Sequence, residues 1–385
     1  MRVLVVHNLY QHLGGEDLVM QAETALLHAN GHEVRSFIRD NDQVATMGRA
    51  RLAARTIWSA STVREVRREL AQWRPDVVHV HNTLALISPS VYWACAAAHV
   101  PVVQTIHNFR LLCPQAIFLR DERVCEDCLG RLPWRAALHG CYRGSRSQSA
   151  VLASMLVAHR ALGTWRNKVT RYIALNEFCR RKLIEGGLPP ARIAIKPNFV
   201  DVPALAPRPR SGFLYVGRLA PEKGIGVLAQ ASAAMPTAPI RVAGDGPSAE
   251  LLAQASSALV RLGSMPGEQV LAEMAGALAL LLPSICYESF PRTLVEAYAC
   301  GLPVIASRLG ALADLVEHRV TGLLFEAGNA NDLAAQMRWA MEHPDAMLQM
   351  GRNARARYEA EFTAERNYQQ LMAIYRDAIA DGGSA

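Results

Sequence analysis

The sequence has no stretch approaching 18 uninterrupted apolar residues, which argues against a helical membrane span. Its first residues, Met1–His7, form a short apolar run that lacks the length and the small-residue cleavage site of a signal peptide. Eight cysteines in 385 residues are too few for a secreted disulfide scaffold. We therefore expect a cytoplasmic protein with reduced thiols.

Aromatic residues are also scarce, at 6% of the chain, so the core must be largely aliphatic and rich in alanine. Hydrophobic residues make up 51% and charged residues 19%, which is ordinary globular usage and excludes a disordered or collagen-like chain. A chain of 385 residues suggests two or three domains, each able to bury a core without disulfides.

Positive charge is concentrated in the first half of the chain. Residues 1–198 contain 26 basic and 15 acidic residues, a net charge of +11, whereas the remainder contains 15 and 19, a net charge of −4. Such asymmetry indicates an anionic partner for the first half, either nucleic acid or a membrane surface.

Short β-branched runs alternate with helical patterns, which predicts parallel sheets built from crossover units. The predicted strands of a first series are Val3–Val6, His32–Ile38, Asp76–Val80, Val102–Ile106, Tyr172–Leu175 and Arg192–Ile195. The proline-rich stretch Pro197–Arg210 is the predicted linker. The predicted strands of a second series are Phe213–Val216, Ile240–Ala243, Leu278–Leu282 and Val304–Ala306. Two α/β domains with a cleft between them suggest a two-substrate enzyme.

A glycine turn with two cations follows the first strand of the second series. Gly217 allows a ligand to approach the backbone, Arg218 can bind phosphate oxygens through two hydrogen bonds, and Lys223 adds a point charge. The helix that follows offers unpaired N–H groups to an anion. Gly244, in a Gly-Asp-Gly-Pro sequence, follows the next strand in the same way. The alternative is a surface loop with solvated cations and an ordinary strand–helix turn.

Two glutamates follow the apolar strand Leu278–Leu282. Glu288 lies in the loop after that strand, and Glu296 lies on the apolar face of the next helix. A buried carboxylate is costly unless it is hydrogen-bonded, and sugar hydroxyls are natural partners because a carboxylate accepts several hydrogen bonds. The alternative is a glutamate satisfied by local backbone.

These motifs together resemble the retaining nucleotide-sugar glycosyltransferases of family 4 (group 1), over nearly the whole chain. The resemblance implies the GT-B fold, in which two Rossmann-like domains have parallel sheets facing a central cleft. It implies that Arg218 and Lys223 hold the donor diphosphate, that Glu296 binds the nucleotide ribose beside Gly217 and Gly244, and that Glu288 contacts the donor sugar. No catalytic metal is expected, because the cations and a helix N-terminus neutralise the leaving diphosphate.

The first domain matches the same family. Gly14 and Gly15 resemble the glycine loop whose backbone approaches the donor diphosphate and the acceptor, although a plain turn is the alternative. His107 resembles the family's strand-end histidine at the reaction centre, where Asn108 departs from the usual aspartate. His79 and His81 alternate along a strand and share one face, and a structural role is the preferred interpretation for both. The implied boundaries are 1–198 for the acceptor-side domain, 199–365 for the donor-binding domain, and 366–385 for a helix packing back on the first.

A cysteine-rich insertion at about 107–148 interrupts the alternation. Four thiols, Cys113, Cys125, Cys128 and Cys141, are enough for tetrahedral zinc, which would organise a loop that lacks its own core. The alternatives are four ordinary thiols, or a redox pair at Cys125 and Cys128.

Arginine-rich segments at 49–74 and 128–176 contain Trp58, Trp134 and Trp165, and the second has no acidic residue. Arginine with interfacial tryptophan is typical of a segment lying on an anionic membrane, and a solvated basic face is the alternative. A nucleic-acid surface fits the charge but not the donor motifs.

The sequence therefore predicts a retaining glycosyltransferase at the cytoplasmic membrane face. It would move a sugar from a UDP- or GDP-sugar to a glycan or lipid-linked saccharide. The alternatives are a non-catalytic sugar-nucleotide or polyanion-binding protein, and another GT-B enzyme such as a phosphorylase or epimerase.

Overall fold

The computed structural model describes residues 1–11, 14–203, 208–253 and 255–382. His12 and Leu13 of the glycine loop, and 204–207 of the predicted linker, lie outside these residues. The chain forms two compact units. Unit 1 comprises Met1–Ile117, Glu126–Pro197 and Asn367–Ala385, and unit 2 comprises Phe118–Cys125 and Asn198–Arg366.

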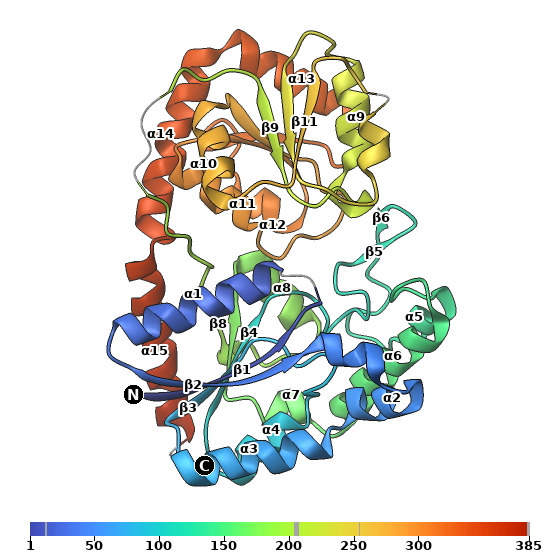
Figure 1. The fold of residues 1–385 in the computed structure, drawn as a ribbon, viewed down its shortest axis with the longest axis vertical. Coiled ribbons are helices and arrows are strands. Elements are labelled where there is room, and N and C mark those ends of the chain that lie inside the picture. The colour runs from blue at the N-terminus through green and yellow to red at the C-terminus, as the bar shows by residue number, and fades with distance from the viewer. Residues whose placement is uncertain (12–13, 204–207, 254, 383–385) are drawn as a thin grey trace. The chain divides into compact units, whose positions relative to one another are not determined.

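Unit 1 is built on a parallel sheet whose six described strands have the order β2-β1-β3-β4-β7-β8 (Figure 1). These strands are β1 (Arg2–Leu9), β2 (Glu33–Asp40), β3 (Val77–Val80), β4 (Val102–Ile106), β7 (Arg171–Ala174) and β8 (Ile193–Ile195). The six strands expected from the first alternating series are confirmed: the bounds of β4 are as predicted, and those of the other five are shifted by at most three residues. Strands β3 and β4 are buried throughout, which explains their continuous apolar runs.

The helices of unit 1 surround this sheet. They are α1 (Gly15–Ala29), α2 (Arg49–Ile57), α3 (Ala60–Trp73), α4 (Val91–Ala97), α5 (Trp134–His139), α6 (Arg146–Ala161), α7 (Thr164–Asn167) and α8 (Glu177–Glu185), with the 3-10 turns η1 (Asn41–Thr46) and η2 (Pro190–Arg192). The last helix, α15 (Ala364–Gly382), belongs to unit 1 from Asn367 onward. Its Leu371, Tyr375 and Ala378 pack in one core with Val3 and Val77 of the sheet.

Unit 2 has its own parallel sheet, with the described strands in the order β11-β10-β9-β12-β13-β14. These strands are β9 (Phe213–Val216), β10 (Ile240–Ala243), β11 (Leu259–Gly263), β12 (Ala279–Leu282), β13 (Val304–Ser307) and β14 (Gly322–Phe325). The sequence patterns predicted four of them and missed the two edge strands. β11 alternates poorly because its middle residues are exposed. β14 is as long as the four strands that were found, and its residues Gly322–Phe325 include a glycine, which weakens a strand pattern.

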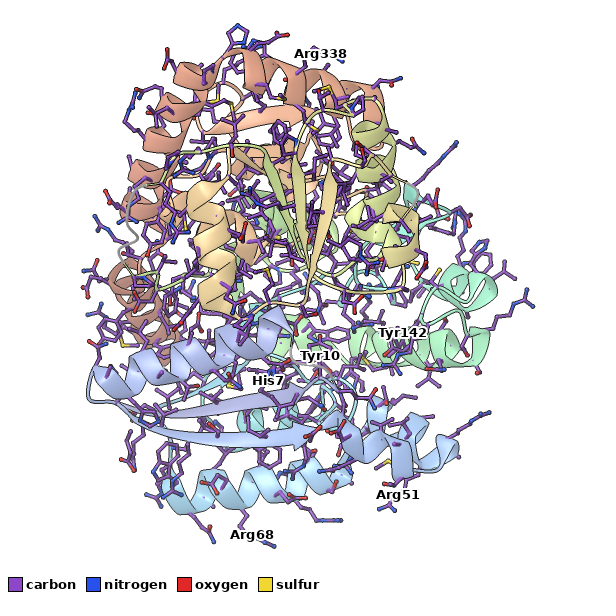
Figure 2. The ribbon with its side chains drawn as sticks, turned by 45° about the horizontal axis from the view of Figure 1, so that its top comes forward. His7, Tyr10, Arg51, Arg68, Tyr142 and Arg338 are labelled. Atoms are coloured by element: carbon purple, nitrogen blue, oxygen red, sulfur yellow. The ribbon has the colours of Figure 1, made fainter. Side chains whose placement is uncertain are left out.

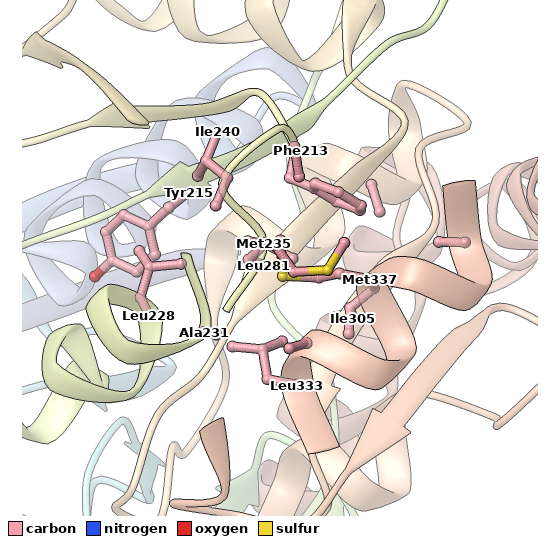
Figure 3. Packing of buried hydrophobic residues seen from close by; sticks show 14 of the residues in the cluster. Phe213, Tyr215, Leu228, Ala231, Met235, Ile240, Leu281, Ile305, Leu333 and Met337 are labelled. Carbon is pink, nitrogen blue, oxygen red and sulfur yellow. The ribbon is translucent and has the colours of Figure 1, made fainter. Parts of the chain in front are cut away.

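The core of unit 2 is largely aliphatic, as the composition of the chain predicts. Figure 3 shows Phe213, Leu281 and Ile305 of the sheet packed against Leu228 and Met337 from two covering helices. The helices of this unit are α9 (Ile225–Ala233), α10 (Gly267–Gly276), α11 (Arg292–Ala299), α12 (Gly310–Leu315), α13 (Ala330–Glu342) and α14 (Pro344–Glu361), with the 3-10 turns η3 (Pro221–Lys223) and η4 (Ala249–Leu252).

The predicted loop at about 107–148 is not structureless. It contains the short helix α5 and a two-stranded hairpin of β5 (Leu119–Arg120) and β6 (Arg123–Val124). The hairpin belongs to unit 2, where Phe118 makes an edge-to-face contact with Tyr287, the ring centroids being 5.8 Å apart. The remainder of the insertion belongs to unit 1. Elements this short carry too little periodicity to be detected in a sequence.

Candidate active site

Each sheet has a topological switch point, where the chain stops adding strands on one side of the first strand and begins to add them on the other side. In unit 1 the switch point lies between β1 and β3, and in unit 2 between β9 and β12. Ligands of open parallel sheets bind outside the carboxyl ends of the strands at such points. The predicted site residues follow these strands or their neighbours β4 and β10.

Two glycines, which have no side chain to cover the backbone, follow strands of unit 2. Gly217 follows β9 with φ 152°, and Gly244 follows β10 with φ 139°. A Cβ atom on Gly244 would lie 1.9 Å from the carbonyl oxygen of Gly217, so only glycine allows the two turns to approach this closely. The two glycines therefore allow the turns after β9 and β10 to pack directly against each other.

Lys223 and Glu288 form an ion pair at the unit 2 switch point. The Lys223 Nζ lies 2.6 Å from Glu288 Oε1, and the Ser284 hydroxyl donates to the same oxygen at 2.7 Å. Burial disfavours the Glu288 charge, yet the neighbouring ammonium and the Ser284 hydrogen bond hold its pKa below the usual value. Burial also opposes the charge of Lys223, but Glu288 holds the pKa of the ammonium above its usual value. Both groups are therefore charged at neutral pH.

The other two charged candidates of unit 2 each have an ion-pair partner four residues away in the chain. Arg218 pairs with Glu222 and remains 62% exposed, so its guanidinium is accessible to an anion. Glu296 on α11 accepts from Arg292 Nε at 3.0 Å. Burial raises the pKa of Glu296 and Arg292 opposes this shift. The carboxylate is thus satisfied by a side chain, whereas the alternative interpretation had placed local backbone there.

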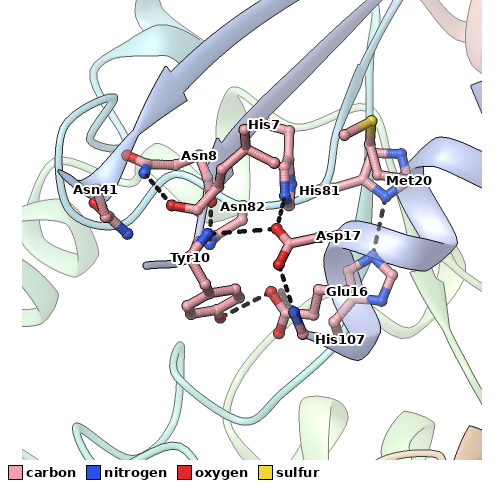
Figure 4. A network of polar contacts seen from close by, with 12 residues as sticks. His7, Asn8, Tyr10, Glu16, Asp17, Met20, Asn41, His81, Asn82 and His107 are labelled. Carbon is pink, nitrogen blue, oxygen red and sulfur yellow. Dashed lines mark hydrogen bonds and ion pairs between the residues drawn. The ribbon is translucent and has the colours of Figure 1, made fainter. Parts of the chain in front are cut away.

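In unit 1, Asp17 organises the glycine loop after β1 (Figure 4). Its Oδ2 accepts from the Gly14 N–H at 2.7 Å, and its Oδ1 lies 2.7 Å from His7 Nε2. Gly14 precedes α1, and Gly15 is the first residue of that helix. Sequence reasoning missed Asp17, although an acidic residue three positions after a helix N-cap is a capping signal.

His107 and Asn108 follow β4, and the second residue explains a departure from the family pattern. The Asn108 amide donates to Glu16 Oε1, while the Tyr10 hydroxyl donates to Glu16 Oε2 at 2.9 Å. An aspartate at 108 would place a second carboxylate against Glu16, whose pKa burial already raises. The asparagine is therefore matched to Glu16 in this chain.

His79 and His81 are both buried beneath the unit 1 switch point. Their side chains share one face, as the alternation predicts, because the Nδ1 of His79 and the Nε2 of His81 lie 4.0 and 3.8 Å from Glu23 Oε2. His81 also forms a hydrogen bond with His107, the predicted reaction-centre histidine: His81 Nδ1 lies 3.0 Å from His107 Nε2. Nothing in the sequence indicates that His81 and His107 are in contact. The fold brings them together because they follow the neighbouring strands β3 and β4.

Comparison with known proteins identifies the family. A family model described as Glycosyltransferase Family 4 matches residues 14–203, and one described as Glycosyl transferases group 1 matches residues 204–357. The chain belongs to glycosyltransferase family 4, group 1.

The relatives of this chain within the family differ in substrate. The chain is 30% identical over 308 residues to a glycogen synthase of Mycobacterium tuberculosis, and the match covers 75% of this chain and 66% of the relative. It is 29% identical to a phosphatidyl-myo-inositol mannosyltransferase of Mycobacterium leprae, covering 86% and 81%. It is 35% identical to a D-rhamnosyltransferase of Pseudomonas aeruginosa, covering only 40% and 42%.

Solved structures share the fold of the family 4 chain. Anabaena HepE in complex with UDP and glucose superposes with a TM-score of 0.69 at 18% identity, over 97% of this chain and 98% of that one. The sucrose-phosphate synthase of Thermosynechococcus elongatus superposes with a TM-score of 0.71 at 19% identity, over 98% and 99%. The two parallel α/β units therefore form the GT-B fold.

In this family 4 chain, unit 1 gathers the segments that carry three of the four predicted zinc ligands. The Arg160 guanidinium donates to the Leu111 carbonyl oxygen at 2.9 Å and to the Arg131 carbonyl oxygen at 2.7 Å, which ties the neighbours of Cys113 and Cys128 together. The Arg110 guanidinium lies 5.1 Å from the ring centroid of Tyr142, the residue after Cys141. Cys125 precedes Cys128 by three residues.

The arginine-rich segments are only partly a surface. Figure 2 shows Arg51 on α2 and Arg68 on α3 pointing outward, and Trp134 is 59% exposed. Trp165, in contrast, is only 4% exposed and belongs to the core, so its interpretation as an interfacial side chain is wrong. Arg160 is likewise occupied with loop carbonyls rather than with the surface. Among the described residues, no helix is long and apolar enough to cross a bilayer.

Proposed function

We propose that this protein is a retaining glycosyltransferase that uses a nucleoside-diphosphate sugar as donor. The observation that carries the proposal is the group at the unit 2 switch point, where Arg218 and Lys223 follow the Gly217 turn after β9 and the Gly244 turn after β10 packs against that turn. Two cations close to the N-terminus of a helix, here α9, are suited to bind a diphosphate. HepE, a structural relative, binds UDP and UDP-glucose, which supports a UDP-sugar as the first donor to test, with a GDP-sugar as the second.

The proposed roles follow the resemblance, residue by residue. Arg218 and Lys223 stabilise the charge that develops on the departing diphosphate, with the backbone of Gly14 and Gly15 beside it. Glu296 accepts hydrogen bonds from the ribose hydroxyls near Gly217 and Gly244. Glu288 and His107 contact the donor sugar. Because two cations already face the leaving group, we expect turnover to be largely insensitive to chelators.

Activity without an acceptor tests this proposal against a non-catalytic binding protein. A panel of UDP- and GDP-sugars is incubated with the purified chain, and release of nucleoside diphosphate is measured. The proposal expects hydrolysis of at least one donor, with the sugar first appearing in the anomeric configuration of the donor. Binding without any release would favour a sugar-nucleotide-binding protein, and initial inversion would remove the retaining mechanism.

The proposed acceptor is a glycan or a lipid-linked saccharide at an anionic cytoplasmic membrane face. The exposed arginines of α3, Arg64, Arg67 and Arg68, support this proposal, and one relative acts on phosphatidyl-myo-inositol. Each basic residue near an anionic surface contributes about 1 kcal/mol, and salt screens the attraction. Replacing the three arginines with serine should weaken sedimentation with anionic vesicles and leave donor affinity unchanged. Equal binding to neutral vesicles at low salt would leave only a solvated basic face.

We also propose one structural zinc on Cys113, Cys125, Cys128 and Cys141. Four thiolates close a tetrahedral coordination sphere and leave no position for substrate, so the ion would stabilise the insertion rather than take part in the reaction. The contacts made by Arg160 and Arg110 gather three of the segments concerned. Elemental analysis should find about one zinc per chain. Zinc-free protein in which all four thiols titrate would reject the site.

A further inference from the structure

A cluster of ionisable side chains lies buried beneath the strand ends of unit 1. Glu23 comes from α1, His79 lies on β3, His81 directly follows it, and Lys196 directly follows β8. The side chains of these four residues are at most 1% exposed. The Lys196 ammonium donates to Glu23 Oε1, so the positive charge of the lysine and the negative charge of the glutamate neutralise each other.

The geometry does not favour a metal ion in this cluster. Glu23, His79 and His81 offer ligand atoms within 4.8 Å of one another, which is close enough for a shared cation. However, the Lys196 ammonium already neutralises Glu23. Both nitrogens of His79 also have hydroxyl partners, Tyr375 at 2.7 Å and Thr105 at 2.8 Å. Lys196 therefore already supplies the positive charge that a metal would bring to Glu23.

His81 connects this cluster to His107. The planes of the two rings are inclined by 14°, and His81 Nδ1 lies 3.0 Å from His107 Nε2. Burial, together with neighbouring ionisable groups, lowers the pKa of both imidazoles well below the usual value, so both are neutral at pH 7. A neutral imidazole has one N–H and one lone pair. One ring must therefore donate to the other, and which one donates fixes the tautomer of both.

Glu23 decides the direction of this hydrogen bond. Its Oε2 is buried without a hydrogen-bond partner and lies 3.8 Å from His81 Nε2. A proton on that nitrogen is attracted to the carboxylate oxygen, whereas a lone pair there would be repelled. His81 therefore has its proton on Nε2 and accepts at Nδ1, so His107 donates from its own Nε2.

We propose that Glu23 and His81 are positioning residues that hold His107 in one orientation and in the tautomer with its proton on Nε2. Lys196 fixes the charge of Glu23. The consequence for the reaction rests on the proposed function: the deprotonated Nδ1 of His107 would accept a hydrogen bond from a hydroxyl of the donor sugar. Recognition by this residue would then require a hydroxyl that donates, and a deoxy or fluoro sugar at that carbon would be a poor donor.

Nitrogen-15 NMR of histidine-labelled protein tests the tautomer directly, because imidazole nitrogens with and without a proton resonate far apart. In the unaltered chain we expect His107 to have its proton on Nε2. In His81→Leu the acceptor is lost, and both tautomers of His107 should be populated. In His81→Asn the amide oxygen stands close to the former Nδ1 position, and the Nε2 tautomer should return. The double variant Glu23→Gln/Lys196→Met removes the charge pair together and should loosen the preference.

His159→Asn is the matched control, because His159 is another buried histidine of unit 1, hydrogen-bonded to Thr164 and to the Ile57 carbonyl, and it should leave the His107 signals unchanged. A proton on Nδ1 of His107 in the unaltered chain would overturn the proposal. So would a tautomer that His81→Leu does not change.

Kinetics supply a second readout. Misplacing a group at the reaction centre costs up to about 100-fold in rate, so His81→Leu should lower kcat roughly 10- to 100-fold while the donor KM changes little, and His81→Asn should recover most of the loss. A KM effect alone would contradict positioning of His107. If the unaltered chain transfers no sugar, the proposed function fails, and the NMR result still decides the tautomer.

Discussion

The two units share a six-stranded parallel sheet with one switch point, but the side chains at their strand ends differ in charge and burial. At the strand ends of unit 1 the polar groups are buried, and His79, His81 and His107 are held neutral. At the strand ends of unit 2 the functional groups are charged, and Arg218 and Lys223 are partly exposed. A buried neutral network can orient hydrogen bonds to a neutral sugar, whereas accessible cations can receive an anionic diphosphate.

The comparison also separates two kinds of ion pair. Lys196 and Glu23 are buried in unit 1 and have no access to solvent, so each depends on the other. In unit 2 Glu288 retains the Ser284 hydroxyl if Lys223 turns to a ligand. The first pair is therefore expected to govern stability, and the second to govern activity.

The largest expected effect is that of Lys196→Met. This change leaves the Glu23 carboxylate buried without its cation, and breaking a buried pair from one side costs about 3–5 kcal/mol. Urea unfolding should show the loss. The control is Arg35→Met, which breaks the exposed pair between Arg35 and Glu69 and should cost less than about 1 kcal/mol. Equal losses in the two variants would end the distinction between the pairs.

Lys223→Met and Arg218→Met should act on turnover instead. A lost charge-assisted contact is worth roughly 1.5–3 kcal/mol, so each variant should be about 10- to 100-fold slower in donor cleavage. The free energy of unfolding should change far less than in Lys196→Met. Cleavage that survives the double variant would show that these cations do not face the diphosphate.

Gly244→Ala should destabilise the packing of the Gly244 turn against the Gly217 turn in unit 2. The added Cβ would meet the Gly217 carbonyl oxygen at 1.9 Å in a backbone conformation that alanine rarely adopts, and we expect a loss of about 1–3 kcal/mol. Gly267→Ala, at the start of α10 with no neighbour within 4 Å, is the control and should remain within about 0.5 kcal/mol. Stability similar to the parent in Gly244→Ala would mean that the turns can separate.

Acid should weaken unit 1 before unit 2. The folded state lowers the pKa of the buried histidines, that of His79 to about 4, while an unfolded chain takes up these protons near pH 6.5. Stability therefore falls by up to about 1.4 kcal/mol per pH unit for each histidine as pH drops below about 6.5. Among the described residues of unit 2, burial lowers the pKa of one histidine, His318, and the lowered pKa of Glu288 acts only below the ordinary carboxylate range, near pH 4.3. Hydrogen-exchange protection should decline in β3 before β12, and simultaneous decline would contradict the contrast.

How far the sequence predicted the site depends on how local each interaction is. Gly217, Arg218, Lys223 and Glu288 lie in short motifs that follow strands, so parallel topology and the resemblance to the family together were enough to group them. The Glu23–Lys196 and His81–His107 contacts join residues 173 and 26 positions apart. No local pattern encodes such pairs, because they depend on which strands become neighbours.

The same reasoning explains what was missed in the fold. The six strands of unit 1 carry apolar runs or alternation strong enough to be found, whereas β11 exposes its middle residues. Trp165 was misplaced because a sequence window shows which residues are near in the chain, and not which face of α7 is covered. Asp17 could have been found, since its spacing from Gly14 is a helix-capping signal.

Calorimetric titration with a nucleoside diphosphate and with the corresponding nucleoside tests the central claim most directly. In the proposed binding mode the diphosphate lies at Lys223 of unit 2 and the ribose at Glu296. Lys223→Met should therefore weaken the diphosphate ligand about 10- to 100-fold and leave the nucleoside unchanged, while Glu296→Ala should weaken both. Unchanged affinity for the diphosphate in folded Lys223→Met and Glu296→Ala proteins would show that the nucleotide does not bind at the unit 2 switch point.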